Sequence, residues 1–339
     1  MSNIIVTGGC GFIGSNLIKR MFSDPTKEYT ILNIDKLTYA GHLRNQTDYE
    51  YNPNYFFEKV DIINLEKIHK IFTLFEPDAI IHLAAESHVD RSIDSSSEFV
   101  GTNVVGTVAL LEAAREYCTH SNRLDNFRFL YISTDECFGS LGFDDLPFTE
   151  HSQYKPNSPY SASKAAADHF VRAWYKTYGL KTLITHCSNN YGPQQLPEKL
   201  IPNTIFKAFF RKKIPVYGTG ENIRDWIHVN DHCDALLTVL EKGIPGEMYS
   251  IGGNNELSNI LLVKKMCDLI DTIMKHKEEK CEARQSLIEF VIDRKGHDLR
   301  YAIDSSKIKK ELGWEPKIDF EKGFKETVIW YLSHKDWWL

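Results

Sequence analysis

A tyrosine and a lysine that could act together in proton transfer lie four residues apart in Tyr160-Ser161-Ala162-Ser163-Lys164. Residues at this spacing share one face of a helix. An ammonium group held beside a phenol stabilises the phenolate, so it would lower the tyrosine pKa from its ordinary value of about 10. The tyrosine could then act as a base near neutral pH. Pairs of this kind also occur by chance on surfaces, so this interpretation depends on where the fold puts them.

Two adjacent carboxyl groups form a second candidate site in Ser133-Thr134-Asp135-Glu136. Neighbouring carboxyls in a half-buried site have their pKa values pushed apart, which gives one acid and one base. In a solvated loop the same pair would have no chemical meaning. Here a strongly apolar segment directly precedes the pair, which predicts a strand that carries both side chains to the edge of a sheet.

A glycine-rich turn follows the first apolar segment, with Gly8, Gly11 and Gly14 at a regular spacing of three. Such glycines let the backbone approach a pyrophosphate, and the helix that follows presents free N–H groups to it. Asp35 ends the next predicted strand. A carboxylate there can accept hydrogen bonds from the adenosine ribose and would repel a 2′-phosphate, which predicts NAD as the cofactor in preference to NADP.

Strands and helices alternate through the first half of the chain. We predict strands at Ile4–Thr7, Thr30–Ile34, Tyr55–Lys59, Ala79–Leu83, Phe127–Ser133 and Lys181–His186. We predict helices at Ile13–Phe22, Leu65–Phe75, Glu98–Tyr117 and Pro159–Tyr178. This alternation is typical of a parallel sheet with helices on both faces, and nearly continuous apolar strands fit that arrangement.

The pattern changes after about residue 189, where prolines and glycines divide the chain into shorter segments. Helices are predicted there at Ile201–Arg211, Val229–Leu240 and Asn259–His276, and a solvated charged loop at Glu278–Arg284. The sequence therefore predicts an α/β fold: a Rossmann-type, doubly wound parallel sheet (residues 1–188) and a smaller, mixed α/β substrate-binding lobe (residues 189–339), with interleaved segments. Ligands bind at the carboxyl edge of such sheets.

Composition restricts the partners. A net charge of −6 without a basic tract does not favour nucleic acid or an anionic membrane. Seven scattered cysteines without a C-x-x-C pair predict reduced thiols and no metal site. A strand predicted at residue 4 leaves no room for a targeting peptide, and no apolar run reaches the about 18 residues of a membrane span. We therefore expect a cytoplasmic protein.

The glycine turn, Asp35 and the Tyr160/Lys164 pair together resemble the extended short-chain dehydrogenase/reductase superfamily. Within it, the chain resembles the dTDP-glucose 4,6-dehydratases over nearly its whole length. The segments that carry this resemblance are residues 84–92 (AAESHVDRS), 133–136 (STDE), 188–193 (SNNYGP), 224–226 (RDW), 293–298 (DRKGHD) and 312–314 (LGW).

The resemblance implies that NAD, tightly bound and recycled, serves the conversion of an NDP-glucose to a 4-keto-6-deoxy sugar and water. The reaction would oxidise C4, eliminate across C5 and C6, and return the hydride to C6. Tyr160 would take the C4 hydroxyl proton, Lys164 would hold the tyrosine pKa down, and Thr134 would hydrogen-bond the C4 oxygen. Glu136 would remove the C5 proton, and a protonated Asp135 would protonate the departing C6 oxygen.

The resemblance also implies binding residues and a homodimer that pairs through Glu98–Tyr117 and Pro159–Tyr178. Cofactor contacts are expected at Gly8, Gly11, Phe12, Ile13, Gly14, Asp35, Lys36, Thr38, Asp61, Ile62, Leu83, Ala84, Ala85, Ser87, Thr102, Tyr160, Lys164 and Asn190. Substrate contacts are expected at Ser87, His88, Thr134, Asn189, Lys199, Leu200, Pro215, Tyr217, Arg224, Asn259, Arg294 and His297. The chain departs from the family at Cys137-Phe138, where valine and tyrosine are usual.

Several alternatives remain at this point. A UDP-galactose 4-epimerase or UDP-glucuronate decarboxylase shares the glycine turn and the Tyr/Lys pair but lacks the adjacent carboxyls. A non-catalytic NAD-binding regulator would typically have lost the tyrosine or the lysine, and an ordinary alcohol dehydrogenase would release NADH. The choice between thymidine and uridine nucleotides stays open, because one methyl group is worth only about 1–3 kcal/mol in an apolar pocket.

Overall fold

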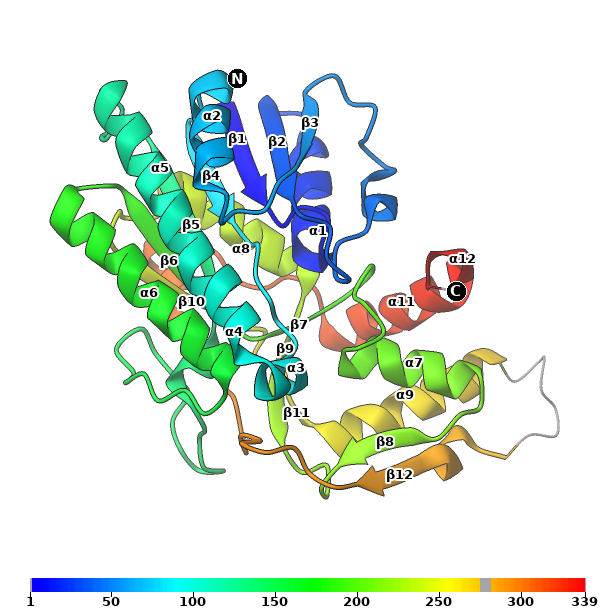
Figure 1. Cartoon of the computed structure of the whole chain (residues 1–339). Coiled ribbons are helices and arrows are strands. Elements are labelled where there is room, and N and C mark those ends of the chain that lie inside the picture. Colours follow the sequence, from blue (N-terminus) through cyan, green and yellow to red (C-terminus); the bar gives the residue numbers. More distant parts are fainter. Residues whose placement is uncertain (1, 275–281, 339) are drawn as a thin grey trace.

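The computed structural model describes residues 2–274 and 282–338, and its centre is a parallel sheet of seven strands in the order β10-β6-β5-β4-β1-β2-β3 (Figure 1). The strands are β1 (Ser2–Thr7), β2 (Tyr29–Asp35), β3 (Tyr55–Lys59), β4 (Ala79–His82), β5 (Arg128–Thr134), β6 (Thr182–Cys187) and β10 (Met248–Ile251). All pairings in this sheet are parallel. The predicted Rossmann-type fold and its six predicted strands are confirmed, with ends that differ by at most two residues.

Helices cover both faces of this sheet because its side chains alternate between two apolar clusters. Ile4 and Val6 of β1 pack in one cluster, and Ile5 packs in the other. The first cluster lies under α1 (Phe12–Phe22), α8 (Val229–Lys242) and α10 (Ser306–Leu312). The second lies under α2 (Leu65–Phe75), α5 (Gly106–His120) and α6 (Pro159–Tyr178). Both faces of the sheet are therefore buried from solvent.

A smaller lobe packs beside the carboxyl edge of the sheet and has its own apolar core (Figure 1). It contains the sheet β11-β9-β7 (Glu256–Ser258, Ile223–His228, Asn189–Tyr191) and the parallel pair β12-β8 (Ile288–Val291, Ile214–Tyr217). Its helices are α7 (Leu200–Phe209), α9 (Asn259–Met274), α11 (Phe320–Ser333) and α12 (Lys335–Trp338). Although β10, α8 and α10 lie beyond residue 189, they pack on the first sheet. In the described ranges, no helix is long and apolar enough to cross a membrane.

The structure departs from the predicted elements before α5 and after residue 305. The predicted helix Glu98–Tyr117 is divided into α4 (Ser96–Phe99), a π-helical turn η2 (Val100–Val105) and α5. In this turn Asn103 is buried and donates hydrogen bonds to Ser163 Oγ (2.8 Å) and the Glu86 carbonyl (3.0 Å). These tertiary contacts explain why local pattern did not reveal the turn. Seven helices of the described residues were also not predicted: α10, α11 and α12 near the end of the chain, α3 (Val89–Asp94), η1 (Leu43–Gln46), η3 (Asp135–Phe138) and η4 (Arg284–Leu287). Cys281, His276 and part of the predicted charged loop fall outside the described residues.

Candidate active site

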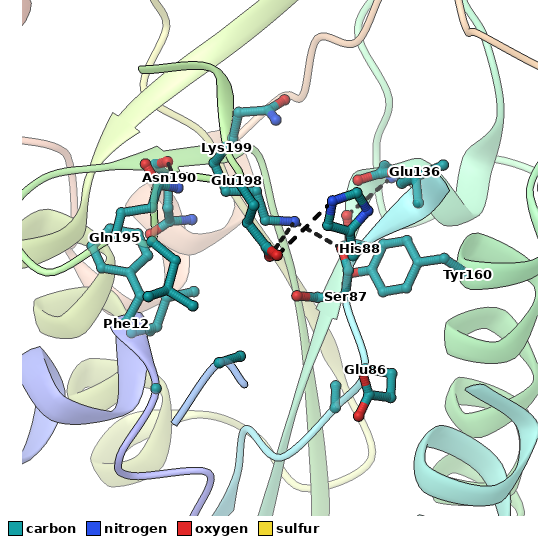
Figure 2. Close-up of a pocket in the computed structure, with 18 of the residues that line it drawn as sticks. Phe12, Glu86, Ser87, His88, Glu136, Tyr160, Asn190, Gln195, Glu198 and Lys199 are labelled. Atoms are coloured by element: carbon teal, nitrogen blue, oxygen red, sulfur yellow. Dashed lines mark hydrogen bonds and ion pairs between the residues drawn. The ribbon is translucent and has the colours of Figure 1, made fainter. Parts of the chain in front are cut away.

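The predicted site residues line one cavity of about 500 Å³ between the sheet edge and the smaller lobe. Figure 2 shows side chains from both lobes converging on this cavity, among them Phe12, Glu136, Tyr160 and Lys199. Of all the residues predicted to bind cofactor or substrate or to act in catalysis, only Asp61 is not among its lining residues. Its neighbours Val60 and Ile62 line the cavity, and the Asp61 carboxylate lies 3.5 Å from Lys36 Nζ.

The glycine turn forms a tight backbone loop, called the glycine cradle below, in which residues with a side chain would not fit at Gly8 and Gly14. Gly8 has a φ of +73°, and a Cβ atom at Gly14 would lie 2.3 Å from the Gly8 carbonyl oxygen. Gly11 is the N-cap residue of α1 and has no side chain to bond the free N–H groups of the first turn. These groups and the helix dipole therefore favour an anionic ligand at this position.

Asp35 closes the other end of the cradle. Its two carboxylate oxygens accept hydrogen bonds from the backbone N–H groups of Cys10 (3.0 Å) and Leu37 (2.8 Å). Burial raises the pKa of this carboxyl, and the two backbone donors oppose that effect. Each oxygen keeps a lone pair for a ligand hydroxyl, because a carboxylate has about four acceptor positions.

Thr134, Asp135 and Glu136 lie where β5 ends and the short helix η3 begins. The Thr134 hydroxyl accepts a hydrogen bond from the Glu136 N–H (3.3 Å) and so closes the turn. Asp135 is only 2% exposed, and within the described part of the chain its Oδ2 atom has no hydrogen-bond partner. This is the environment of a carboxyl group that is held protonated.

The two carboxyls differ in their surroundings. Burial, followed by the charges of Glu136 and Asp225, raises the pKa of Asp135 well above its ordinary value. Burial also raises the pKa of Glu136, but the cationic side chains of Lys199 and Arg224 lower it. Both carboxyl pKa values are raised, but that of Asp135 is raised more strongly, and only Glu136 has cations as its largest influences after burial. The pair is thus differentiated in the sense that a dehydration would require, with Asp135 the better acid and Glu136 the better base.

Tyr160 and Lys164 lie in the first turns of α6, which a capping box formed by Ser158 and Ser161 starts. Burial lowers the pKa of Lys164 to about 8. Its Nζ atom donates a hydrogen bond to the Ile132 carbonyl (2.6 Å) and lies 4.2 Å from the centre of the Tyr131 ring.

The predicted lowering of the Tyr160 pKa by Lys164 is wrong for the chain alone. Burial raises the pKa of Tyr160 well above its ordinary value, and the nearby charge of Glu136 adds to this effect. The Lys164 ammonium donates its hydrogen bond to the Ile132 carbonyl and not to the Tyr160 hydroxyl.

The cations on the smaller lobe are already held by acceptors. Arg224 donates to the Asp298 carbonyl (3.0 Å), and its guanidinium lies 4.2 Å from the centre of the Tyr301 ring. Arg294 donates to the Asp90 carboxylate (2.9 Å). Lys199 donates to the Ser87 carbonyl (2.8 Å), as Figure 2 shows. A ligand with two phosphates would meet three cations whose positions are fixed beforehand.

Comparison with known proteins agrees with this geometry. The model of the GDP-mannose 4,6 dehydratase family matches residues 5–327. A dTDP-glucose 4,6-dehydratase of Escherichia coli is 52% identical and is matched over 99% of this chain and 95% of its own. The enzyme of that name from Neisseria meningitidis is also 52% identical, over 100% and 95%. The chain belongs to the dTDP-glucose 4,6-dehydratase family.

Solved structures give the same result for this dehydratase. The Bacillus anthracis dTDP-glucose 4,6-dehydratase, crystallised with NAD, has a TM-score of 0.87 and 45% identity, and the match covers 100% of this chain and 99% of that one. The Streptomyces venezuelae dTDP-glucose 4,6-dehydratase, also solved with NAD, has a TM-score of 0.90, 41% identity and coverage of 99% and 98%. A Thermotoga maritima UDP-glucose 4-epimerase shares the fold at a TM-score of 0.83 with 28% identity, over 98% and 99%.

Several lining residues of the dehydratase were not predicted. Glu86, Asp90 and Asp298 lie within segments that carried the resemblance, and Glu198 precedes the predicted Lys199. A signal was therefore present, but Asp90, Asp298 and Glu198 contact cations of the site and Glu86 bonds Asn103 through its backbone, roles that show only in three dimensions. For Tyr301, the ring under Arg224, we find no sequence signal.

The two residues that depart from the family, Cys137 and Phe138, are both buried and packed against neighbouring side chains. The Phe138 ring is 2% exposed and lies 4.7 Å from His186 and 5.3 Å from Tyr154, measured between ring centres. Cys137 is fully buried, and burial raises the pKa of its thiol well above the ordinary value. The thiol is therefore a small buried group and not a nucleophile.

Proposed function

We propose that this enzyme converts dTDP-glucose to the 4-keto-6-deoxy sugar and water. The observation that carries the proposal is the position of Asp135 and Glu136: a buried acid and a half-buried base share one cavity with Tyr160. An epimerase or a decarboxylase has no use for such a pair. The names of the relatives that match this chain over its full length support the same reaction.

Each catalytic side chain has a defined task in this proposal. Tyr160 accepts the proton of the C4 hydroxyl, and Thr134 hydrogen-bonds the C4 oxygen. The C4 ketone acidifies the C5–H bond, so that the carboxylate of Glu136 can remove this proton. Asp135 delivers its proton to the C6 oxygen, which leaves as water. Lys164 keeps a positive charge beside the tyrosine.

NAD fits the first half of the cavity. We propose that the glycine cradle and the N-terminus of α1 hold its pyrophosphate, while Asp35 accepts hydrogen bonds from its ribose hydroxyls. Lys36, Thr38, Ile62 and Thr102 line the same part of the cavity. When bound, the cofactor supplies the oxidising and reducing equivalents of the reaction and is recycled.

The nucleoside diphosphate is assigned to the second half of the cavity. Arg224 and Arg294 present guanidinium groups there, which suit two neighbouring phosphates. We therefore assign NAD mainly to residues 1–188 and the nucleotide sugar mainly to residues 189–339, with β10, α8 and α10 returning to the first lobe. The cytoplasm is the proposed compartment, which the six buried free cysteines of the described residues support.

A product assay with dTDP-glucose and UDP-glucose in parallel, without added NAD, tests the reaction. We expect water loss by mass spectrometry and a 4-keto sugar detected in alkali, with dTDP-glucose the faster substrate. Activity without added NAD would show that the cofactor is purified with the protein and recycled. Substrate that keeps its water, even with NAD supplied, would contradict the dehydratase and direct attention to epimerisation.

We also propose a homodimer that pairs through η2, α5 and α6. Small or apolar side chains at intervals of four form an exposed or half-exposed stripe on each segment: Val100, Val104 and Val108, and Ala162, Ala166 and Phe170. Phe170 is 38% exposed and Val100 50%. Phe170→Glu is expected to convert the dimer to a monomer in sedimentation analysis, because a charge would be buried without a partner. A matched change at Phe290, which is 59% exposed and lies in β12, should leave the mass unchanged.

A further inference from the structure

A buried aspartate–histidine pair lies directly behind the catalytic residues, outside the cavity. Asp168 of α6 and His186 of β6 are 1% and 0% exposed, and the Asp168 Oδ2 atom is 2.9 Å from His186 Nε2. The same oxygen accepts a hydrogen bond from the Ser133 hydroxyl (3.0 Å). Neither Asp168 nor His186 is among the cavity-lining residues, so neither contacts substrate or cofactor directly. A buried carboxylate is costly and persists only with such partners.

These contacts hold the end of β5, whose last residue is Thr134. The Ile132 carbonyl accepts the Lys164 hydrogen bond, and the next side chain, Ser133, donates to Asp168. The Ser133 carbonyl is 3.5 Å from Cys187 Sγ. Consecutive residues of the strand are thereby tied to α6 and β6. The position of the acidic pair that follows depends on these ties.

Lys164 and Asp168 lie one turn apart on α6, so both anchors of the strand come from one helix face. We propose that Asp168 is a positioning residue for the dehydration, which holds the end of β5 in place and supplies the buried negative charge that keeps Lys164 protonated. His186 and Ser133 orient this carboxyl group through their contacts with its Oδ2 atom. The inference rests on the proposed function, since its first readout is dehydration.

The charges around Lys164 give Asp168 this electrostatic role. Burial lowers the pKa of Lys164 to about 8, and Asp168 contributes the largest opposing effect, ahead of Cys137 on η3 and Cys187 on β6. The other groups that face it are the Tyr131 ring on β5, Tyr160 on its own helix, and His82 on β4, whose pKa is lowered well below its ordinary value by burial and by Lys164 itself. Without Asp168, the ammonium would lose its main anionic neighbour.

The test compares Asp168→Asn with Ser133→Ala as functions of pH, with dTDP-glucose as substrate. Asp168→Asn keeps the shape but removes the charge, so we expect kcat to fall by about 10-fold or more, KM to change little, and the alkaline limb of the kcat profile to move about one pH unit lower. Ser133→Ala removes one tie and keeps the charge, so kcat should fall while the alkaline limb stays in place. Asp231→Asn is the control, because that buried carboxylate binds the Ile318 N–H (2.9 Å) and does not line the cavity.

A second measurement does not depend on turnover. NMR titration of lysine labelled at the ε-carbon, assigned with Lys164→Met, gives the Lys164 pKa directly in the wild-type enzyme and in Asp168→Asn. A lower pKa in the variant supports the inference, and an unchanged pKa with an unchanged alkaline limb overturns it. An active wild type with an unaffected Asp168→Asn enzyme would contradict only this inference. A wild type that releases no water would contradict the proposed function, while the titration would still decide the role of Asp168.

Discussion

Tyr160→Phe is expected to reduce water loss from dTDP-glucose by about 10²- to 10⁴-fold, because positioned proton transfer contributes this much to catalysis. The substitution removes only the phenolic hydroxyl from a side chain that is 9% exposed. The variant should retain NAD and bind substrate, yet fail to oxidise it. The measurement combines the initial rate with the near-ultraviolet absorbance of reduced cofactor after substrate is added, which should not increase.

Tyr249→Phe provides the control for this prediction. Tyr249 is fully buried in β10, bonds Glu311 and the Ile244 N–H, and does not line the cavity. Both variants lose one buried hydroxyl, but only Tyr160→Phe should lose activity. Full dehydration by Tyr160→Phe would remove the tyrosine from the mechanism.

Glu136→Gln is expected to separate the two halves of the reaction. The amide has nearly the same shape but cannot take the C5 proton, so oxidation at C4 should continue while elimination falls by about 10²- to 10⁴-fold. Reduced cofactor should then accumulate on the enzyme, and no deuterium should enter C5 in heavy water. Complete dehydration by this variant would show that another group is the base.

Asp135→Asn is the matched comparison for Glu136→Gln, because it changes the adjacent carboxyl in the same way. It should still exchange the C5 proton with solvent, since the base is intact, but it should release water slowly, since the proton donor is gone. Identical behaviour of the two variants would contradict the assignment of separate acid and base roles.

The sequence was sufficient to predict features that depend only on neighbouring residues. The turn at Gly8, Gly11 and Gly14 requires a tight backbone between a strand and a helix, and that requirement shows in the residue types alone. Apolar strands and amphipathic helices were found for the same reason. The Thr134-Asp135-Glu136 motif was located because a strand end predicts the edge at which it lies.

Other features arise only when distant segments meet. The high pKa of Tyr160 depends on burial and on Glu136, so the Tyr-x-x-x-Lys spacing alone suggested the opposite direction. The π-helical turn depends on the bonds that Asn103 makes to Ser163 and Glu86. The edge strand β10 could not be assigned to the first sheet, because its four residues carry no pattern that indicates pairing with β6.

The place of β10 governs how this protein can be synthesised. While the chain is growing, β6 has an unpaired edge until residues 248–251 have been translated, after the segments that form β7, α7, β8, β9 and α8. Unpaired edges of this kind are sites of aggregation. The first sheet is therefore completed only by a strand from beyond residue 188, and a fragment that ends at residue 188 would expose the β6 edge permanently.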